Sequence, residues 1–174
     1  MLDPFLRRHA ARATAPAAAW LERIQIRALA LTLAAFVCAI AAMLDIGHRR
    51  YLWGLGFLLA AGLFDALDGP LARRRGATAF GAYLDTVLGL VAEAGIAFAF
   101  ALAEPDRALA AMFLMLGLVA RASAGTDGAK SELLLGCTLA CLFPNWFSLI
   151  AYALGIAGFV EAGSRVAAHA VREP

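Results

Sequence analysis

Charged side chains are scarce in this chain: they make up 16% of its 174 residues, against about 25% in an average soluble domain. Hydrophobic residues make up 63%, and the mean hydropathy is +0.77. The sequence also lacks the alternation of apolar and polar residues that marks the strands of an outer-membrane barrel. These absences argue against a soluble domain and a barrel, and they predict an integral membrane protein built from helices.

Three further features are missing or weak. The net charge is only +2, so we expect no nucleic-acid partner; attraction to anionic membrane lipids accounts for the basic excess. Cysteine is limited to Cys38, Cys137 and Cys141. All three lie in apolar runs, where a thiol acts as a small hydrophobe, so packing is favoured over a redox or metal role. No linker or internal repeat divides the chain.

Apolar segments long enough to cross a membrane dominate the rest of the chain. A hydrocarbon core of about 30 Å requires roughly 20 helical residues. The fold class predicted is therefore all-α integral membrane, with six transmembrane helices in a domain over residues 28–174. The expected spans are Ala28–Ile46, Tyr51–Leu71, Phe80–Ala103, Ala108–Ala124, Leu133–Phe143 and Trp146–Ala168. The fifth is short, and Pro144 separates it from the sixth.

Residues 1–27 contain five arginines and too few consecutive apolar residues for a span. We expect an amphipathic helix lying on the cytoplasmic membrane surface over roughly Leu2–Ile26. Its expected lipid contacts are Phe5, Leu6, Trp20, Leu21 and Ile24.

The basic residues are distributed unevenly between the two ends of the predicted spans. Only Arg49, Arg50 and Arg107 fall on one side, and the other twelve fall on the opposite side. Because cytoplasmic loops carry the excess of Lys and Arg, both termini and the Arg73–Arg75 cluster are expected in the cytoplasm. The protein is therefore expected in the cytoplasmic, or inner, membrane.

Three carboxylates lie inside this apolar sequence at helical spacing. Asp65 and Asp68 share a face near the end of the second span, and Asp85 lies on the third. A carboxylate costs roughly 2.5 to 3.5 kcal/mol to place in a membrane, so three together indicate a bound partner. Because the connection between the spans is short, the acids can face one another across a helical hairpin. An oxygen-only ligand set suits Mg²⁺, Mn²⁺ or Ca²⁺. The alternative is that the acids neutralise nearby arginines.

Small and basic residues accompany these acids. Gly69 and Gly81 leave room for a ligand to approach the backbone, and Arg73 can pair with phosphate oxygens. Pro70 removes a backbone hydrogen bond beside the acids, which a membrane tolerates where a wet cavity or another partner satisfies the freed group. The hairpin is therefore expected to bind an anionic ligand together with the cation.

This pattern resembles the signature of the CDP-alcohol phosphatidyltransferases. The matching positions are Asp65, Asp68, Gly69, Ala72 and Arg73, followed after a short gap by Gly81 and Asp85. The resemblance implies transfer of a phosphatidyl group from a CDP-linked lipid, such as CDP-diacylglycerol, to a small alcohol acceptor, with release of CMP. It also implies dependence on Mg²⁺ or Mn²⁺, a cytoplasmic active site and a possible homodimer.

The resemblance assigns a role to each matching residue. Asp65, Asp68 and Asp85 would be metal ligands, and Asp85 would belong to the catalytic group. Substrate contacts would come from Gly69, Ala72, Arg73, Gly81 and Lys130. For Lys130, a cation that only sets the membrane orientation is an equal alternative. The signature leaves the acceptor open among alcohols such as serine, inositol, glycerol phosphate and inositol phosphate.

The chain departs from the family pattern in two places. Gly89 stands where the family has a fourth Asp, a metal ligand and proposed general base, and Ala28 and Leu29 stand where Pro-Asn is common. Glu93 lies one turn beyond Gly89, about 5.4 Å along the helix, and is the candidate replacement base. A structural hydrogen bond is its alternative role. These departures leave open an impaired family member that binds nucleotide-lipid or acts as a partner subunit. A cation transporter is the less favoured third hypothesis.

Overall fold

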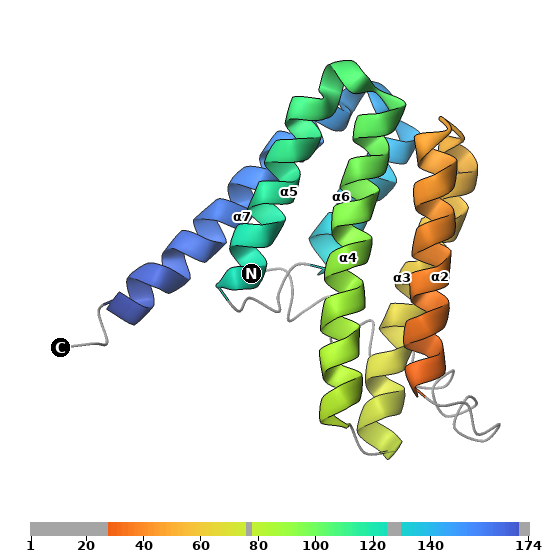
Figure 1. Cartoon of the computed structure of the whole chain (residues 1–174), viewed down its shortest axis with the longest axis vertical. Helices are drawn as coiled ribbons and strands as arrows, with labels where there is room; N and C mark the ends of the chain where they lie inside the picture. The colour runs from red at the N-terminus through yellow and green to blue at the C-terminus, as the bar shows by residue number, and fades with distance from the viewer. Residues whose placement is uncertain (1–27, 76–77, 125–129, 171–174) are drawn as a thin grey trace.

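The computed structural model describes residues 28–75, 78–124 and 130–170. Within these ranges the chain forms six α-helices and two short 3₁₀ helices, with no strand (Figure 1). The predicted surface helix at residues 1–27 lies outside the described residues. The helices are α2 (Ala28–Gly47), α3 (Tyr51–Arg75), α4 (Ala79–Ala103), η1 (Pro105–Arg107), α5 (Ala108–Ser123), α6 (Lys130–Leu142), η2 (Pro144–Trp146) and α7 (Phe147–Ala170).

Among the residues that the structure describes, four segments are long and apolar enough to cross a membrane, which supports an all-α membrane protein. They are Ala28–Gly47, Tyr51–Ala72, Ala79–Ala103 and Pro144–Ala170. The two remaining predicted spans form α5, with 16 residues, and α6, with 13 residues. At 1.5 Å per residue these helices are shorter than the hydrocarbon core of about 30 Å. The structure therefore supports four of the six predicted spans by length.

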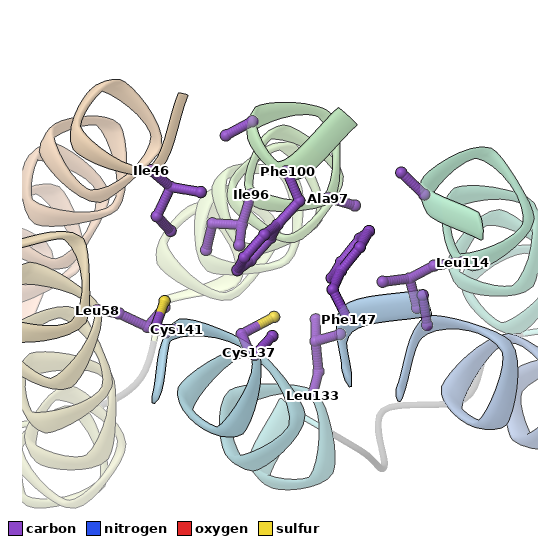
Figure 2. Packing of buried hydrophobic residues seen from close by; sticks show 14 of the residues in the cluster. Ile46, Leu58, Ile96, Ala97, Phe100, Leu114, Leu133, Cys137, Cys141 and Phe147 are labelled. Atoms are coloured by element: carbon purple, nitrogen blue, oxygen red, sulfur yellow. The ribbon is translucent and has the colours of Figure 1, made fainter. Parts of the chain in front are cut away.

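The helices pack around a main apolar core, and a second, smaller cluster of buried apolar residues lies between α2 and α3. α2 lies against α3 and α4, α5 joins α4 to α7, and α6 contacts α3 and α7 (Figure 1). Each of the six described α-helices contributes buried residues to the main core. Figure 2 shows part of this packing, in which the rings of Phe100 and Phe147 stack with centroids 4.5 Å apart. Cys137 and Cys141 are buried here as well, in agreement with their predicted packing role.

At the end of the bundle opposite the α3–α4 connection, hydrogen bonds join the segments that connect neighbouring helices. Arg49 Nε donates to the carbonyl of Ala103 at 2.8 Å, and the Tyr51 hydroxyl donates to Glu104 Oε1 at 3.1 Å. Arg107 donates to the carbonyl of Pro144 and to the side chain of Asn145. Two of the three arginines assigned to the non-cytoplasmic side thus stabilise this end of the bundle.

Helices α5 and α7 approach closely through glycine. A Cβ atom added at Gly117 would lie 2.7 Å from the carbonyl oxygen of Gly155, and one added at Gly158 would lie 2.6 Å from that of Gly117. Small residues allow membrane helices to approach this closely and to gain van der Waals contact. The sequence contains these glycines, but only the packing shows that the two backbones touch at this point.

We therefore expect Gly117→Ala to destabilise the protein by about 1 to 3 kcal/mol, because the added methyl group meets backbone rather than a movable side chain. Thermal unfolding in detergent measures the change. Gly163→Ala, also on an apolar helix, is the matched control, since nothing lies within 4 Å of its added Cβ. An equal melting temperature for Gly117→Ala and the wild type would contradict the observed helix contact.

Candidate active site

Three carboxylates converge between α3 and α4. One oxygen from each of Asp65, Asp68 and Asp85 lies within 4.8 Å of the other two. Asp68 is buried, with 8% of its surface exposed, and the other two are partly exposed. The structure therefore brings together the three residues that the helical spacing placed on facing sides of a hairpin.

The position of Asp85 depends on how α4 begins. Thr78 caps the helix: its side-chain oxygen accepts a hydrogen bond from the backbone N–H of Gly81 at 3.1 Å. This cap satisfies one of the N–H groups that a helix start leaves without an intrahelical partner. The cap sets the residue at which α4 starts and therefore the face on which Asp85 lies. Gly81, expected to contact substrate, is also part of this cap.

A third helix contributes to the acid cluster. Thr32 on α2 donates a hydrogen bond from Oγ1 to Asp68 Oδ2 at 3.0 Å, and both residues are buried. The sequence interpretation did not assign this role to Thr32. A signal was available, because Thr32 is the only hydroxyl residue in α2 and, apart from Asp45 near the other end, the helix is apolar.

Glu93, the candidate replacement base, lies in an ion pair with α5. Its Oε2 is 3.4 Å from Arg121 Nη2, and the two side chains are only 16% and 12% exposed. Glu93 is not a member of the three-acid group. The contact matches the structural alternative stated for Glu93, with an arginine as partner. Arg121 is one of the twelve basic residues expected on the cytoplasmic side, and the sequence predicts no contact between it and Glu93.

The remaining expected site residues lie on α3, α4 and α6. Gly69 and Ala72 are partly buried on α3, after Asp68, and Gly89 is partly buried on α4. Arg73 lies in the last turn of α3 and Lys130 is the first residue of α6. The side chains of these two residues lie outside the described part of the structure.

The acid cluster fits a small divalent cation. Its ligand atoms are carboxylate oxygens, the donors that Mg²⁺, Mn²⁺ and Ca²⁺ prefer. Oxygens on opposite sides of Mg²⁺ are about 4.2 Å apart, twice the usual metal–oxygen distance. The separation of up to 4.8 Å among Asp65, Asp68 and Asp85 is close to that size.

Comparison with known proteins agrees with this geometry. Residues 25–129 match the family model of the CDP-alcohol phosphatidyltransferases. The inner membrane protein YnjF of Escherichia coli is 30% identical in an alignment that covers 78% of this chain and 79% of that protein. The chain therefore belongs to the CDP-alcohol phosphatidyltransferase family, whose members are membrane enzymes of phospholipid biosynthesis.

Two further similarities involve proteins with more specific names. Archaetidylinositol phosphate synthase of Methanothermobacter thermautotrophicus is 41% identical over 68 residues, which cover 38% of this chain and 35% of that enzyme. The crystal structure of Mycobacterium tuberculosis phosphatidylinositol phosphate synthase (PgsA1), with CDP-DAG bound, superposes with a TM-score of 0.71 at 21% identity. That alignment covers 90% of this chain and 92% of the other, and it shows that the two share a fold.

Proposed function

We propose that this enzyme transfers a phosphatidyl group from a CDP-linked lipid, such as CDP-diacylglycerol, to a small alcohol acceptor and releases CMP, with Mg²⁺ or Mn²⁺ as cofactor. The convergence of Asp65, Asp68 and Asp85 carries the proposal. The structural relative is bound to CDP-DAG, which supports the donor. Two relatives are inositol phosphate-type synthases by name, so inositol phosphate is the first acceptor to test.

In the proposed reaction the acceptor oxygen attacks the β-phosphorus of the donor. A new phosphorus–oxygen bond forms, the pyrophosphate bond breaks, and CMP leaves with the bonding electron pair. Asp65, Asp68 and Asp85 would hold the cation, which neutralises phosphate charge when bound. Gly69, Ala72 and Gly81 carry little or no side chain and would leave room for the nucleotide. Arg73 would bind its phosphates, and Lys130 would bind a phosphate on the acceptor or donor.

The acceptor hydroxyl must also lose a proton, and Gly89 cannot accept it. Glu93 is the candidate base on this chain, although its ion pair with Arg121 favours a structural role. Water or a phosphate on the acceptor would otherwise take the proton. Gly89 also supports a second candidate function: a family member that binds nucleotide-lipid, or acts as a partner subunit, with weak turnover or none.

We further propose the membrane arrangement expected from the sequence. α5 and α6 would lie within the membrane alongside the four longer spans, preceded by a surface helix. Both termini and the acid cluster would face the cytoplasm, and the chain could form a homodimer. The positions of Arg49 and Arg107 are consistent with this orientation, because both lie at the end of the bundle opposite the α3–α4 connection. The family match argues against the cation-transporter alternative.

An assay of CMP release tests the proposal. Purified protein is supplied with CDP-diacylglycerol and, in turn, inositol phosphate, glycerol phosphate, serine and inositol. We expect CMP release with one of these acceptors in Mg²⁺ or Mn²⁺ and none in EDTA. Binding of CDP-diacylglycerol without CMP release from any acceptor would favour the second candidate. Absence of both binding and release would refute the proposed function.

Gly89→Asp tests the missing base within the same assay. General-base catalysis typically contributes 10² to 10⁴-fold, so we expect the variant to raise kcat by at least about tenfold. We also expect the pH dependence of kcat to differ between Gly89→Asp and the wild type. An unchanged rate and pH profile would mean that the proton has another route and that Gly89 does not limit turnover.

A further inference from the structure

The hydroxyl group of Thr32 has two acceptors within reach. Its Oγ1 lies 3.0 Å from Asp68 Oδ2 and 3.3 Å from the carbonyl oxygen of Ala28, one turn earlier in α2. One hydroxyl proton serves one acceptor well, and hydrogen bonds to an ionised acceptor are shorter and stronger than neutral ones. The shorter contact to the carboxylate is therefore the main one. The Ala28 carbonyl remains as an alternative acceptor within α2.

The contact with Asp68 crosses between helices that are far apart in sequence. Thr32 and Asp68 are separated by 36 residues, and each is only 8% exposed. The final torsion of an Asp side chain is broad rather than confined to narrow rotamer wells. A hydrogen bond from Thr32 to one carboxylate oxygen restricts that torsion and so helps to fix the direction in which the carboxylate of Asp68 points.

We propose that Thr32 is a positioning residue for the metal site: it holds Asp68 through Oδ2 and makes α2 part of the site that α3 and α4 build. The inference rests on the proposed function, because it assigns Asp68 to a cation. Groups that hydrogen-bond to metal ligands typically change metal affinity by 10 to 100-fold when they are removed. The hydroxyl of Thr32 is a group of this kind, since it donates a hydrogen bond to Asp68.

Mn²⁺ binding to the purified protein without substrate tests this role. Free Mn²⁺ is measured by electron paramagnetic resonance for the wild type, Thr32→Val and Thr32→Ser. Valine keeps the shape of threonine and loses the hydroxyl, so we expect it to weaken Mn²⁺ binding by about 10 to 100-fold. Serine keeps the hydroxyl and should restore most of the affinity. Thr138→Val, on α6, is the matched control and should bind Mn²⁺ like the wild type.

Melting temperatures in EDTA separate positioning from folding. Without metal, we expect Thr32→Val and Thr32→Ser to have melting temperatures close to that of the wild type. Added Mn²⁺ should raise the melting temperature of Thr32→Val less than it raises that of the wild type. Wild-type affinity in Thr32→Val would overturn the inference while leaving the proposed function intact. An equal loss of Mn²⁺ affinity in Thr32→Val and Thr32→Ser would also overturn it, because the shape of the side chain would then matter and the hydroxyl would not. A wild-type protein that binds no Mn²⁺ would refute the metal dependence itself.

Discussion

Asp68→Asn is expected to lower kcat for CMP release by at least about a thousandfold. Asp68 is the most buried of the three converging acids, so its negative charge is poorly replaced by water. A bound divalent ion supplies several kcal/mol of transition-state charge stabilisation, and loss of about 4 kcal/mol corresponds to roughly a thousandfold in rate. The rate is measured with CDP-diacylglycerol and the acceptor that supports wild-type turnover.

Asp68→Asn removes the negative charge without removing the hydrogen-bond acceptor that contributes to folding. The amide oxygen of the new side chain can still accept the hydrogen bond that Thr32 donates to Oδ2, so the contact between α2 and α3 is retained. We therefore expect the melting temperature in EDTA to change little while Mn²⁺ binding is lost. Asp106→Asn is the matched control, because Asp106 lies exposed in η1 at the opposite end of the bundle. More than a tenth of wild-type activity in Asp68→Asn would contradict the proposed ligand role.

Breaking the ion pair between Glu93 and Arg121 is expected to have the largest effect on stability. Both side chains are mostly buried, with 16% and 12% exposed. Removing one partner of a buried pair costs about 3 to 5 kcal/mol, because a charge remains in a poorly solvated site. Glu93→Leu and Arg121→Leu should each lower the free energy of unfolding by about this amount, measured by denaturation in mixed detergent micelles.

The double variant should be much more stable than the sum of the single changes predicts. Replacing a whole buried pair by apolar residues is often neutral or stabilising, and the difference from additivity gives the coupling between the two side chains. Additive single effects would show that this ion pair does not stabilise the packing of α4 against α5.

The same pair of residues distinguishes the two roles considered for Glu93. If Glu93 is the general base, Glu93→Gln abolishes CMP release, and Arg121→Gln leaves a measurable rate with a shifted pH profile. If the pair is structural, both glutamine variants lose stability together, and the protein that remains folded keeps most of its activity. Activity per folded molecule, measured after separation of aggregated protein, decides between these outcomes.

Most helix boundaries were predictable because apolar runs and proline are local signals. α3 begins at Tyr51 and α4 ends at Ala103, as expected. Pro105 and Pro144 each begin a 3₁₀ turn that separates two helices. α3 extends to Arg75, beyond the expected end at Leu71, because Pro70 is accommodated inside the helix. The hydropathy of the sequence predicts only the end of the apolar run, at Leu71. The helix itself continues through the basic residues to Arg75.

The sequence by itself determined the acid cluster, because a short connection and a spacing of three residues place Asp65, Asp68 and Asp85 on facing sides of one hairpin. Only the tertiary structure shows which residues from distant parts of the sequence contact these acids and Glu93. Thr32 reaches Asp68 across 36 residues, and Arg121 reaches Glu93 across 28. These contacts depend on the rotation of α2 and α5 about their axes, and helices that are apolar on nearly every face carry little sequence signal for that rotation.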